Sequence, residues 1–297
     1  MQPIYYFAPA PDSPVWVRRP GRVAHQVGRP HTWSQVPRPQ PSRRLAQLPH
    51  LVVHEVTAEG IDPRHDGLRI VHMTDVHCGR ITGAAHVQAA VELANQTGAD
   101  VVAMTGDYLN WRRDEIPLVR RQLAGLTATH VVCTLGNHDY YASGDHVAGA
   151  LAANGYQVLR NRHLTVDIAG APLHIVGIDD PVTRKDDIEA AFAGVPAGGT
   201  RVALCHCPEA APDIAARGAH LVLSGHTHGG QINVRGITDR IFRSAGRRYF
   251  NAGLYQVDSA WLYVSAGVGF SGVRVRAGRG TRAEVALITL RAPTSLS

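Results

Sequence analysis

The sequence predicts an α/β fold, and three observations carry this prediction. From about residue 51, short apolar runs rich in Val and Ile alternate with stretches of helical periodicity. Gly, Asp or Asn bound the apolar runs, as is typical of buried strands. The chain has 297 residues, 44% of them hydrophobic, which is enough to bury a large core in one large domain or two small ones.

The predicted elements follow one another along the chain in strand–helix alternation. We expect strands at residues 68–73, 100–104, 130–135, 173–178, 201–204, 220–223, 261–265 and 284–290. We expect helices at residues 84–97, 116–126, 145–154 and 186–192. The first of these helices is followed by Gly98, a favourable C-terminal stop.

The N-terminal region differs in composition from the rest of the chain. Residues 1–50 hold seven arginines against one acidic residue, Asp12, so they carry the entire net charge of +6. They also hold ten of the 18 prolines, which disfavour regular elements. We therefore predict a basic, Pro-rich, disordered tail over residues 1–45 and a catalytic domain over residues 51–292. The alternative is that the tail contacts an anionic membrane surface or nucleic acid, because clustered arginines attract anions.

Several classes of protein are excluded by what the sequence lacks. No apolar run approaches the roughly 18 residues of a membrane-spanning helix, and residues 1–14 do not form a secretory signal. Four cysteines are too few for a disulfide scaffold. No nucleophile elbow or P-loop pattern is present, which argues against acyl transfer and NTP-driven work. We expect a cytoplasmic protein, with a peripheral membrane location as the alternative.

Polar side chains follow five of the predicted strands. Ligands of α/β sheets bind beyond the carboxyl ends of the strands, so these side chains lie at the edge where a site is expected. In chain order they are Asp75, His77, Asp107, Asn137, His138, Asp139, His206, His226 and His228. In an extended segment, residues two apart point to the same side, and this spacing pairs Asp75 with His77 and His226 with His228.

This set of side chains suits transition metals. Oxygen and imidazole ligands without thiolate favour Mn, Fe, Zn or Co. Seven of these residues, namely two Asp, one Asn and four His, have ligand spacing. One ion needs fewer than seven ligands, whereas two ions that share one carboxylate would use them all. Two-metal sites clamp phosphoryl oxygens during in-line displacement.

The ordered blocks D-x-H, G-D, G-N-H-D, a strand-borne His and G-H-x-H resemble the calcineurin-like metallophosphoesterases. The similarity runs from about residue 51 to about residue 291. The Gly-His-Thr-His-Gly-Gly-Gln block at 225–231 and the lead-in at 68–72 look most like the bacterial branch that includes the phosphodiesterases YkuE and YaeI. The resemblance implies a four-layer α/β/β/α sandwich with mixed sheets.

The resemblance also implies a role for each site residue. The first metal would be bound by Asp75, His77 and His228. The second would be bound by Asn137, His206 and His226. Asp107 would bridge the two ions, which we expect to be divalent transition metals, with manganese first. His138 would lie just outside the metal shell near the leaving oxygen, and Asp139 would orient it.

Two cysteines, Cys205 and Cys207, flank His206 and allow two interpretations. A Cys-His-Cys zinc cluster is one. Because side chains alternate along a strand, however, both thiols face away if His206 faces the metals, which favours buried free thiols. The same interpretation applies to Cys78 and Cys133.

The expected function is metal-dependent hydrolysis of a phosphate ester, a phosphodiester first, by in-line attack of metal-bound hydroxide. Hydrolysis of a phospholipid or of a nucleotide-linked lipid pyrophosphate is the alternative, which an apolar lip at the site would favour. A non-catalytic scaffold is a further alternative, against which the complete ligand set argues. The neutral domain and the lack of a recognition motif argue against nucleic acid as a partner.

Overall fold

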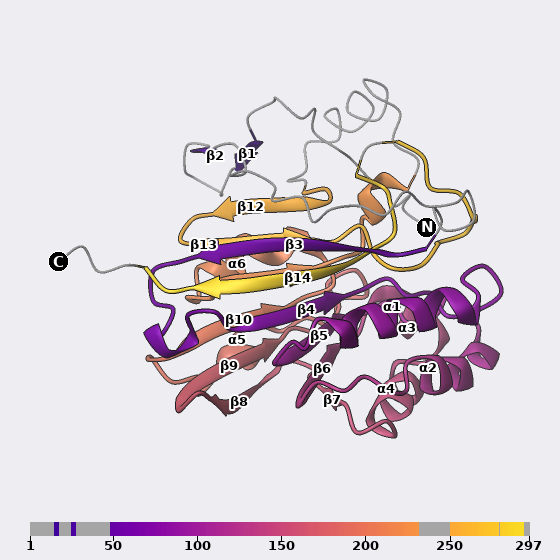
Figure 1. Ribbon diagram of the computed structural model, residues 1–297, viewed down its shortest axis with the longest axis horizontal. Coiled ribbons are helices and arrows are strands. Elements are labelled where there is room, and N and C mark those ends of the chain that lie inside the picture. Colours follow the sequence, from indigo (N-terminus) through magenta and orange to yellow (C-terminus); the bar gives the residue numbers. More distant parts are fainter. Residues whose placement is uncertain (1–14, 18–24, 28–47, 232–249, 279, 294–297) are drawn as a thin grey trace.

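The computed structural model describes residues 15–17, 25–27, 48–231, 250–278 and 280–293 (Figure 1). Its centre is a pair of six-stranded sheets. The first sheet has the order β3-β14-β4-β5-β6-β7. Its strands are His50–Thr57 (β3), Glu284–Arg291 (β14), Arg69–Met73 (β4), Val101–Thr105 (β5), His130–Thr134 (β6) and Gln157–Val158 (β7).

The second sheet has the order β12-β13-β11-β10-β9-β8. Its strands are Gly253–Val257 (β12), Ala260–Val264 (β13), Leu221–Ser224 (β11), Thr200–Leu204 (β10), Ala171–Gly177 (β9) and Arg162–Ile168 (β8). Both sheets are mixed. Strands β4 to β7 are mutually parallel, and so are β9, β10, β11 and β13, whereas β8 and β12 run antiparallel to their neighbours.

Helices cover the outer faces of both sheets. The first sheet carries Ala84–Gln96 (α1), Ile116–Gln122 (α2), Asn137–Ala142 (α3) and Gly144–Ala152 (α4). The second carries Ile188–Phe192 (α5) and Ala211–Ala215 (α6). Four short 3-10 turns complete the described elements, at Pro63–His65 (η2), Arg113–Glu115 (η3), Pro208–Ala210 (η4) and His228–Gly230 (η5).

Alternation along the strands builds three apolar layers. On β5, Val101 and Ala103 pack between the sheets, while Val102 and Met104 pack under α1, α2 and α4. The second sheet does the same, since Leu221 and Leu223 of β11 face the first sheet and Val222 faces α6. The result is the expected α/β/β/α sandwich, with the carboxyl ends of the parallel strands of both sheets at a common edge.

All predicted strands are present, and their ends lie within two residues of the predicted ones. The predicted helix at residues 116–126 ends earlier, at Gln122, and Gly125 then adopts a φ of 94°. The helix predicted from residue 186 begins at Ile188, because the Asp187 side chain caps it by accepting from the Ala190 N–H. The strands β3, β7, β8 and β12 were not predicted, and they are the four edges of the two sheets.

The tail contains two short strands, Val15–Val17 (β1) and His25–Val27 (β2), paired antiparallel. The prediction that the tail lacks regular structure is wrong at these six residues. Neither segment contains proline, so both retain the backbone N–H groups that a strand pair needs. The rest of residues 1–45 lies outside the described residues. Where the structure describes the chain, no helix is long and apolar enough to cross a membrane.

Candidate metal centre

The predicted site residues meet at the common edge of the two sheets. The first sheet contributes Asp75 and His77 after β4, Asp107 after β5, and Asn137 and His138 at the start of α3. The second sheet contributes His206 after β10, and His226 and His228 after β11. The ring Nδ1 of His206 donates to the carbonyl of Thr105, at 2.6 Å, and so connects the ends of β10 and β5. All these side chains are buried.

The backbone at the site differs from the extended form that the sequence suggested. Five of the predicted ligands have positive φ, between 48° and 69°, and they are Asp75, His77, Asp107, His226 and His228. Such left-handed residues are uncommon outside glycine and cluster at functional sites. These segments are therefore not extended strands, and the prediction that strand alternation sets the direction of side chains two residues apart is wrong. His226 and His228 enter different groups of side chains, which is how the resemblance distributes them between the two metals.

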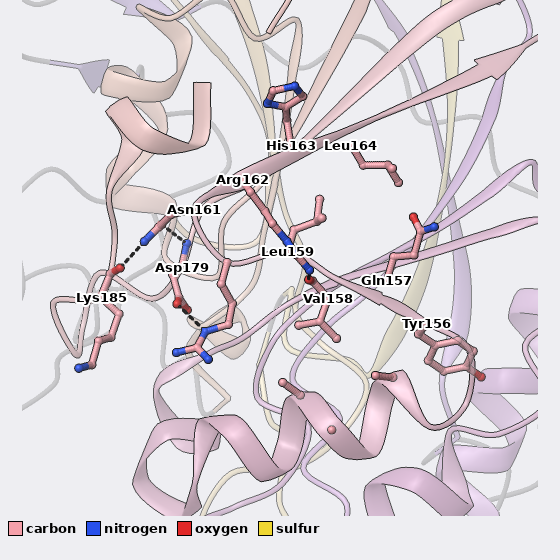
Figure 2. A pocket seen from close by; sticks show the side chains of 14 residues that line it. Tyr156, Gln157, Val158, Leu159, Asn161, Arg162, His163, Leu164, Asp179 and Lys185 are labelled. Atoms are coloured by element: carbon pink, nitrogen blue, oxygen red, sulfur yellow. Dashed lines mark hydrogen bonds and ion pairs between the residues drawn. The ribbon is translucent and has the colours of Figure 1, made fainter. Parts of the chain in front are cut away.

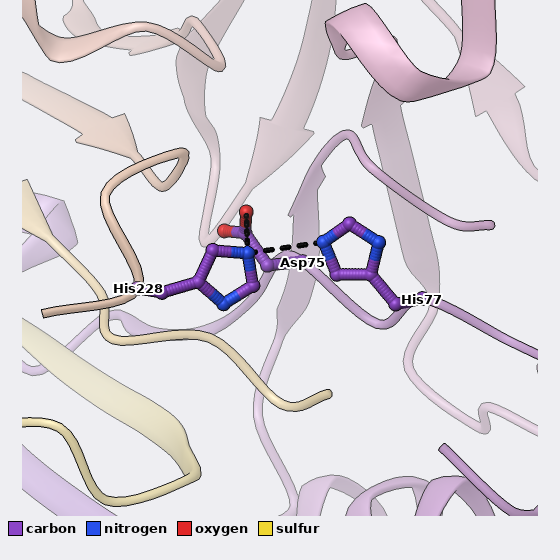
Figure 3. A group of neighbouring side chains, drawn as sticks. All are labelled: Asp75, His77 and His228. Carbon is purple, nitrogen blue, oxygen red and sulfur yellow. Dashed lines mark hydrogen bonds and ion pairs between the residues drawn. The ribbon is translucent and has the colours of Figure 1, made fainter. Parts of the chain in front are cut away.

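One group consists of Asp75, His77 and His228 (Figure 3). The Nε2 atom of His228 lies 3.2 Å from Oδ1 of Asp75 and 3.0 Å from Nε2 of His77. Two imidazole lone pairs this close repel each other unless a proton or a cation lies between them. The three side chains thus form the geometry of a cation site built from one carboxylate and two imidazoles.

A second group consists of Asp107, His206 and His226. Oδ2 of Asp107 lies 3.2 Å from Nε2 of His206 and 3.8 Å from Nε2 of His77. The Asp107 carboxylate therefore stands between the two groups, which is the position a bridging ligand requires. The same oxygen lies 3.9 Å from Nε2 of His138, and His77, Asp107 and His138 form a third group of side chains that could hold a metal.

Asn137 has no hydrogen-bond partner although its side chain is only 1% exposed. Neither its Oδ1 nor its Nδ2 is paired, and Nε2 of His206, despite its short distance to Asp107, lacks hydrogen-bond geometry. An unpaired buried amide is costly, so native proteins rarely keep one without a reason. The donor set of carboxylates, imidazoles and an amide oxygen fits two divalent ions, and a metal would engage the unpaired Oδ1 of Asn137 and Nε2 of His206.

Backbone carbonyls fix the orientation of two of the imidazoles. A carbonyl can only accept, so Nδ1 of His206 carries the hydrogen that it donates to Thr105, and its Nε2 faces Asp107 at 3.2 Å. His138 is held in the same way, with Nδ1 donating to the carbonyl of Asn110. The Nε2 of each ring is left for the centre.

Asp139 does not orient His138, and this prediction is corrected. Oδ2 of Asp139 accepts from the backbone N–H groups of Asp107 and Gly136, and Oδ1 accepts from that of Tyr108, each at 2.9 Å. Burial, with the nearby Asp107 carboxylate, raises the pKa of Asp139 to about 8. Its carboxyl group therefore joins the loops that follow β5 and β6, and the Asn110 carbonyl takes the expected place at the His138 ring.

Burial and the carboxylates set the protonation of the imidazoles. Burial lowers the pKa of His77 and of His226 to about 3, so both rings are neutral near pH 7, the form that binds metal. Burial would lower the pKa of His206 as well, but the Asp107 carboxylate raises it to about 10. Burial also raises the pKa of Asp75, to about 6, which still leaves this carboxyl group mainly ionised at neutral pH.

Arg276 is a site residue that the sequence did not indicate. Its Nη2 lies 3.2 Å from Nδ1 of His228, and the guanidinium donates to the carbonyls of Ala266, Gly269 and Thr281. Burial lowers its pKa to about 10, so it stays charged at neutral pH. One arginine in a loop far along the chain carries no sequence signal for this position.

The cysteines are free and buried, which confirms the thiol interpretation. Cys205 packs in the apolar layer beneath α6, and the thiol of Cys207 donates to Glu209 at 2.7 Å. Neither thiol belongs to the groups of metal-binding side chains found in the described part of the chain.

A separate groove of about 990 Å³ lies between α4 and the edge strands β7 and β8 (Figure 2). Its lining includes Arg160, Arg162, Asp179 and Lys185 but none of the predicted site residues. Arg160 is paired there with Asp179, at 3.1 Å. The chemistry that the sequence predicts therefore lies outside this groove.

Comparison with known proteins places the same residues in a known context. Residues 68–230 match the family model of the calcineurin-like phosphoesterases. Two Bacillus subtilis proteins named uncharacterized metallophosphoesterases are both 29% identical to this chain: YkuE over 239 residues, and YkoQ over 231. The YkuE match covers 77% of this chain and 82% of that protein, and the YkoQ match covers 75% and 83%.

A vertebrate relative extends beyond the matched region. The Danio rerio protein named "transmembrane protein with metallophosphoesterase domain" is 31% identical over 274 residues. The match covers 83% of this chain but 58% of that protein.

Proposed function

Because the chain belongs to the calcineurin-like phosphoesterase family, we propose that it is a metal-dependent phosphodiesterase with a dinuclear centre. The observation that supports a centre with two metal ions is the position of the Asp107 carboxylate. Its Oδ2 lies 3.2 Å from His206 in one group and 3.8 Å from His77 in the other. A carboxylate shared by two ligand groups keeps two cations close enough to act on one phosphate.

Each ligand group is complete in the number and type of its side chains. The first ion would be held by Asp75, His77 and His228, and the second by Asn137, His206 and His226, with Asp107 shared. When bound, the two ions supply Lewis acidity toward the phosphoryl oxygens and toward water. Two divalent cations against two carboxylates leave the centre positive, which favours an anionic phosphate ester.

His138 would act on the leaving group. Its Nδ1 donates to the Asn110 carbonyl, which leaves Nε2 toward the centre. From there Nε2–H could give a proton to the leaving oxygen. The neighbouring charge of Arg276, whose N–H groups are taken up by carbonyls and His228, would offset the negative charge of the phosphate.

A phosphate ester carried by a lipid is the second candidate substrate. One observation favours it, because Trp111 and Tyr141 leave about half of their surface exposed beside the His138 ring. Apolar or amphiphilic leaving groups would contact these two side chains.

The test is metal analysis joined to a substrate panel. The full chain is purified, stripped with a chelator and reloaded separately with Mn²⁺, Fe²⁺, Zn²⁺ or Co²⁺. We expect two equivalents to bind and activity to return, with Mn²⁺ first, and kcat/KM to be higher for phosphodiesters than for phosphomonoesters. Asp107→Asn should lower the content of both ions, whereas His226→Ala should lower one. A single equivalent would refute the dinuclear centre, and preference for monoesters would refute the phosphodiesterase.

A further inference from the structure

We propose that the rim of the metal centre is a docking surface for an anionic lipid bilayer. Over the described residues, the large apolar side chains that remain exposed are few and all lie at this rim. They are Trp111 at 51%, Tyr141 at 49%, Val273 at 52% and Val275 at 51% exposure. An exposed apolar patch rimmed by polar groups marks an interaction site, and here the four side chains lie on segments that contact the His138 side and the His228 side of the centre.

The aromatic half of the rim stands over His138. The Trp111 ring lies 4.7 Å from the His138 ring, between centroids, and the Tyr141 ring lies 5.6 Å from it. Trp111 follows Asn110, whose carbonyl accepts from His138, so its position is tied to the site. Tryptophan and tyrosine combine a large apolar body with a polar group, which is why they gather where membrane meets water.

The aliphatic half of the rim is tied to the opposite ligand group. Gln231, three residues after His228, donates through Nε2 to the carbonyls of Ser271, at 2.8 Å, and Val273, at 3.2 Å. The backbone carbonyl of Gln231 accepts from the N–H of Ala277, at 2.9 Å, and its side-chain Oε1 accepts from the N–H of Ser271, at 2.8 Å. Within this loop Arg276 reaches His228, while the two valines on either side of Arg274 remain exposed.

The charges on the same segments suit an anionic surface. On or beside these segments the exposed cations are Arg80, Arg112, Arg113 and Arg274, and the exposed acids are Asp114 and Asp145, of which Asp145 is paired with Arg160 at 2.7 Å. Asp114 is paired with Arg112 at 2.6 Å, so the rim keeps an excess of positive charge. Arginines can place their charge at headgroup level while their stems cover apolar surface, and each adds attraction to anionic lipids.

A bilayer fits this combination better than a small apolar ligand does. The four side chains come from three segments on both sides of the opening, whereas a small leaving group beside His138 would need only Trp111 and Tyr141. Docking would bring a phosphate ester at the bilayer surface directly to the centre. This consequence rests on the proposed function, whereas the docking itself does not.

The test compares two double variants of the full chain at the same two positions, one with polar side chains and one with apolar side chains. Binding to vesicles of phosphatidylcholine with phosphatidylserine is measured by co-sedimentation of the metal-loaded protein. Val273→Ser with Val275→Ser should weaken partitioning by about tenfold, because two aliphatic side chains no longer enter the interface. Val273→Leu with Val275→Leu should bind as well as the natural chain or better. The basic tail is unchanged in all variants and adds the same background.

A charge variant and a soluble substrate complete the test. Arg274→Gln should weaken binding about fivefold at low salt, and Arg121→Gln, exposed on α2 and outside the rim, should not. Both valine variants should keep turnover of a small soluble phosphodiester.

Equal vesicle binding by the Ser and Leu variants would overturn the proposal. So would a Trp111→Ser variant with intact vesicle binding and reduced turnover of small aryl esters, which would make the aromatic pair a leaving-group pocket. Vesicle binding does not require turnover. The binding result therefore tests the docking surface even if the protein does not hydrolyse phosphodiesters.

Discussion

His138 and the seven proposed ligands are close in space but differ in what holds them. Nδ1 of His138 is bound to the Asn110 carbonyl, and its ring lies against Trp111 at the mouth of the centre. Its Nε2 lies 3.9 Å from Asp107, so both a ligand role and a proton-transfer role are open to it geometrically. Because the two proposed ligand sets do not include it, proton transfer to the leaving oxygen is the role we propose.

Replacing His138 with alanine separates these two roles. We expect His138→Ala to keep both metals and to lose about 10²–10⁴-fold in kcat/KM on an alkyl diester, because positioned proton transfer matters most for a basic leaving oxygen. On a nitrophenyl ester the loss should be much smaller. Metal content and kcat/KM are measured across a series of leaving groups. An equal loss across the series would exclude the acid role, and loss of one metal would make His138 a ligand.

The raised pKa of His206 predicts how metal affinity depends on pH. Burial favours its neutral form, but the Asp107 carboxylate outweighs burial and raises its pKa to about 10, so the metal-free protein holds a proton there at pH 8. A metal must displace that proton, and apparent affinity should therefore rise with pH until about pH 10. Calorimetric titration at pH 8, in buffers of different ionisation enthalpy, should show proton release that falls by about one in His206→Asn. Unchanged proton release in that variant would contradict the raised pKa.

At the scale of the elements, the site depends on how closely the loops after the strands approach one another. Gly106, after β5, has a φ of 92°, and a Cβ there would lie 2.4 Å from the backbone nitrogen of Gly136. The carboxyl group of Asp139 joins the same two loops by accepting from three backbone N–H groups. The bridging Asp107 lies between these contacts, so any widening of the loops displaces it.

Two glycine-to-alanine variants test this dependence. Gly106→Ala combines a positive φ with a backbone clash, so it should destabilise the protein by more than about 1 kcal/mol and lower metal content. Gly149 lies inside α4 with open space around its Cα, so Gly149→Ala should stabilise the protein by about 0.5–1 kcal/mol and leave metal content unchanged. Denaturant unfolding and metal analysis are the measurements. A Gly106→Ala protein with full metal content would show that the close approach is not required.

At the scale of the whole molecule, the centre is shared by two sheets, and its proposed ligands lie far along the chain from the charged tail. The ligands come from loops after β4, β5, β6, β10 and β11, whereas the arginines that account for the net charge lie within residues 1–50. The two short strands of the tail pair with each other. Catalysis on a small substrate should therefore be separable from whatever the tail binds.

Deletion of residues 1–45 tests this separation. We expect turnover of a small soluble diester to stay nearly unchanged, because the proposed ligands all lie beyond residue 70. If the tail contacts anionic lipid, vesicle binding should fall on deletion, and that of the full chain should weaken with salt. The measurements are kcat/KM and vesicle co-sedimentation at two salt concentrations. A folded truncation without turnover would instead show that the tail helps to build the site.

The sequence by itself determined the central strands and the residues at their ends. Interior strands such as β5 are apolar on both faces, so their signal is continuous, and their ligand-bearing ends are marked by polar residues beside glycine. The four edge strands could not be identified, since a strand such as β8 is partly exposed and its polar residues resemble those of a loop.

Only the tertiary structure decided how the site residues are used. His226 and His228 both have left-handed backbone conformations, which a two-residue spacing does not encode. The Asn110 carbonyl at the His138 ring and the Arg276 guanidinium at His228 are contacts between segments far apart in the chain. Such contacts depend on where the folded loops meet, and side-chain spacing along the sequence carries no information about that.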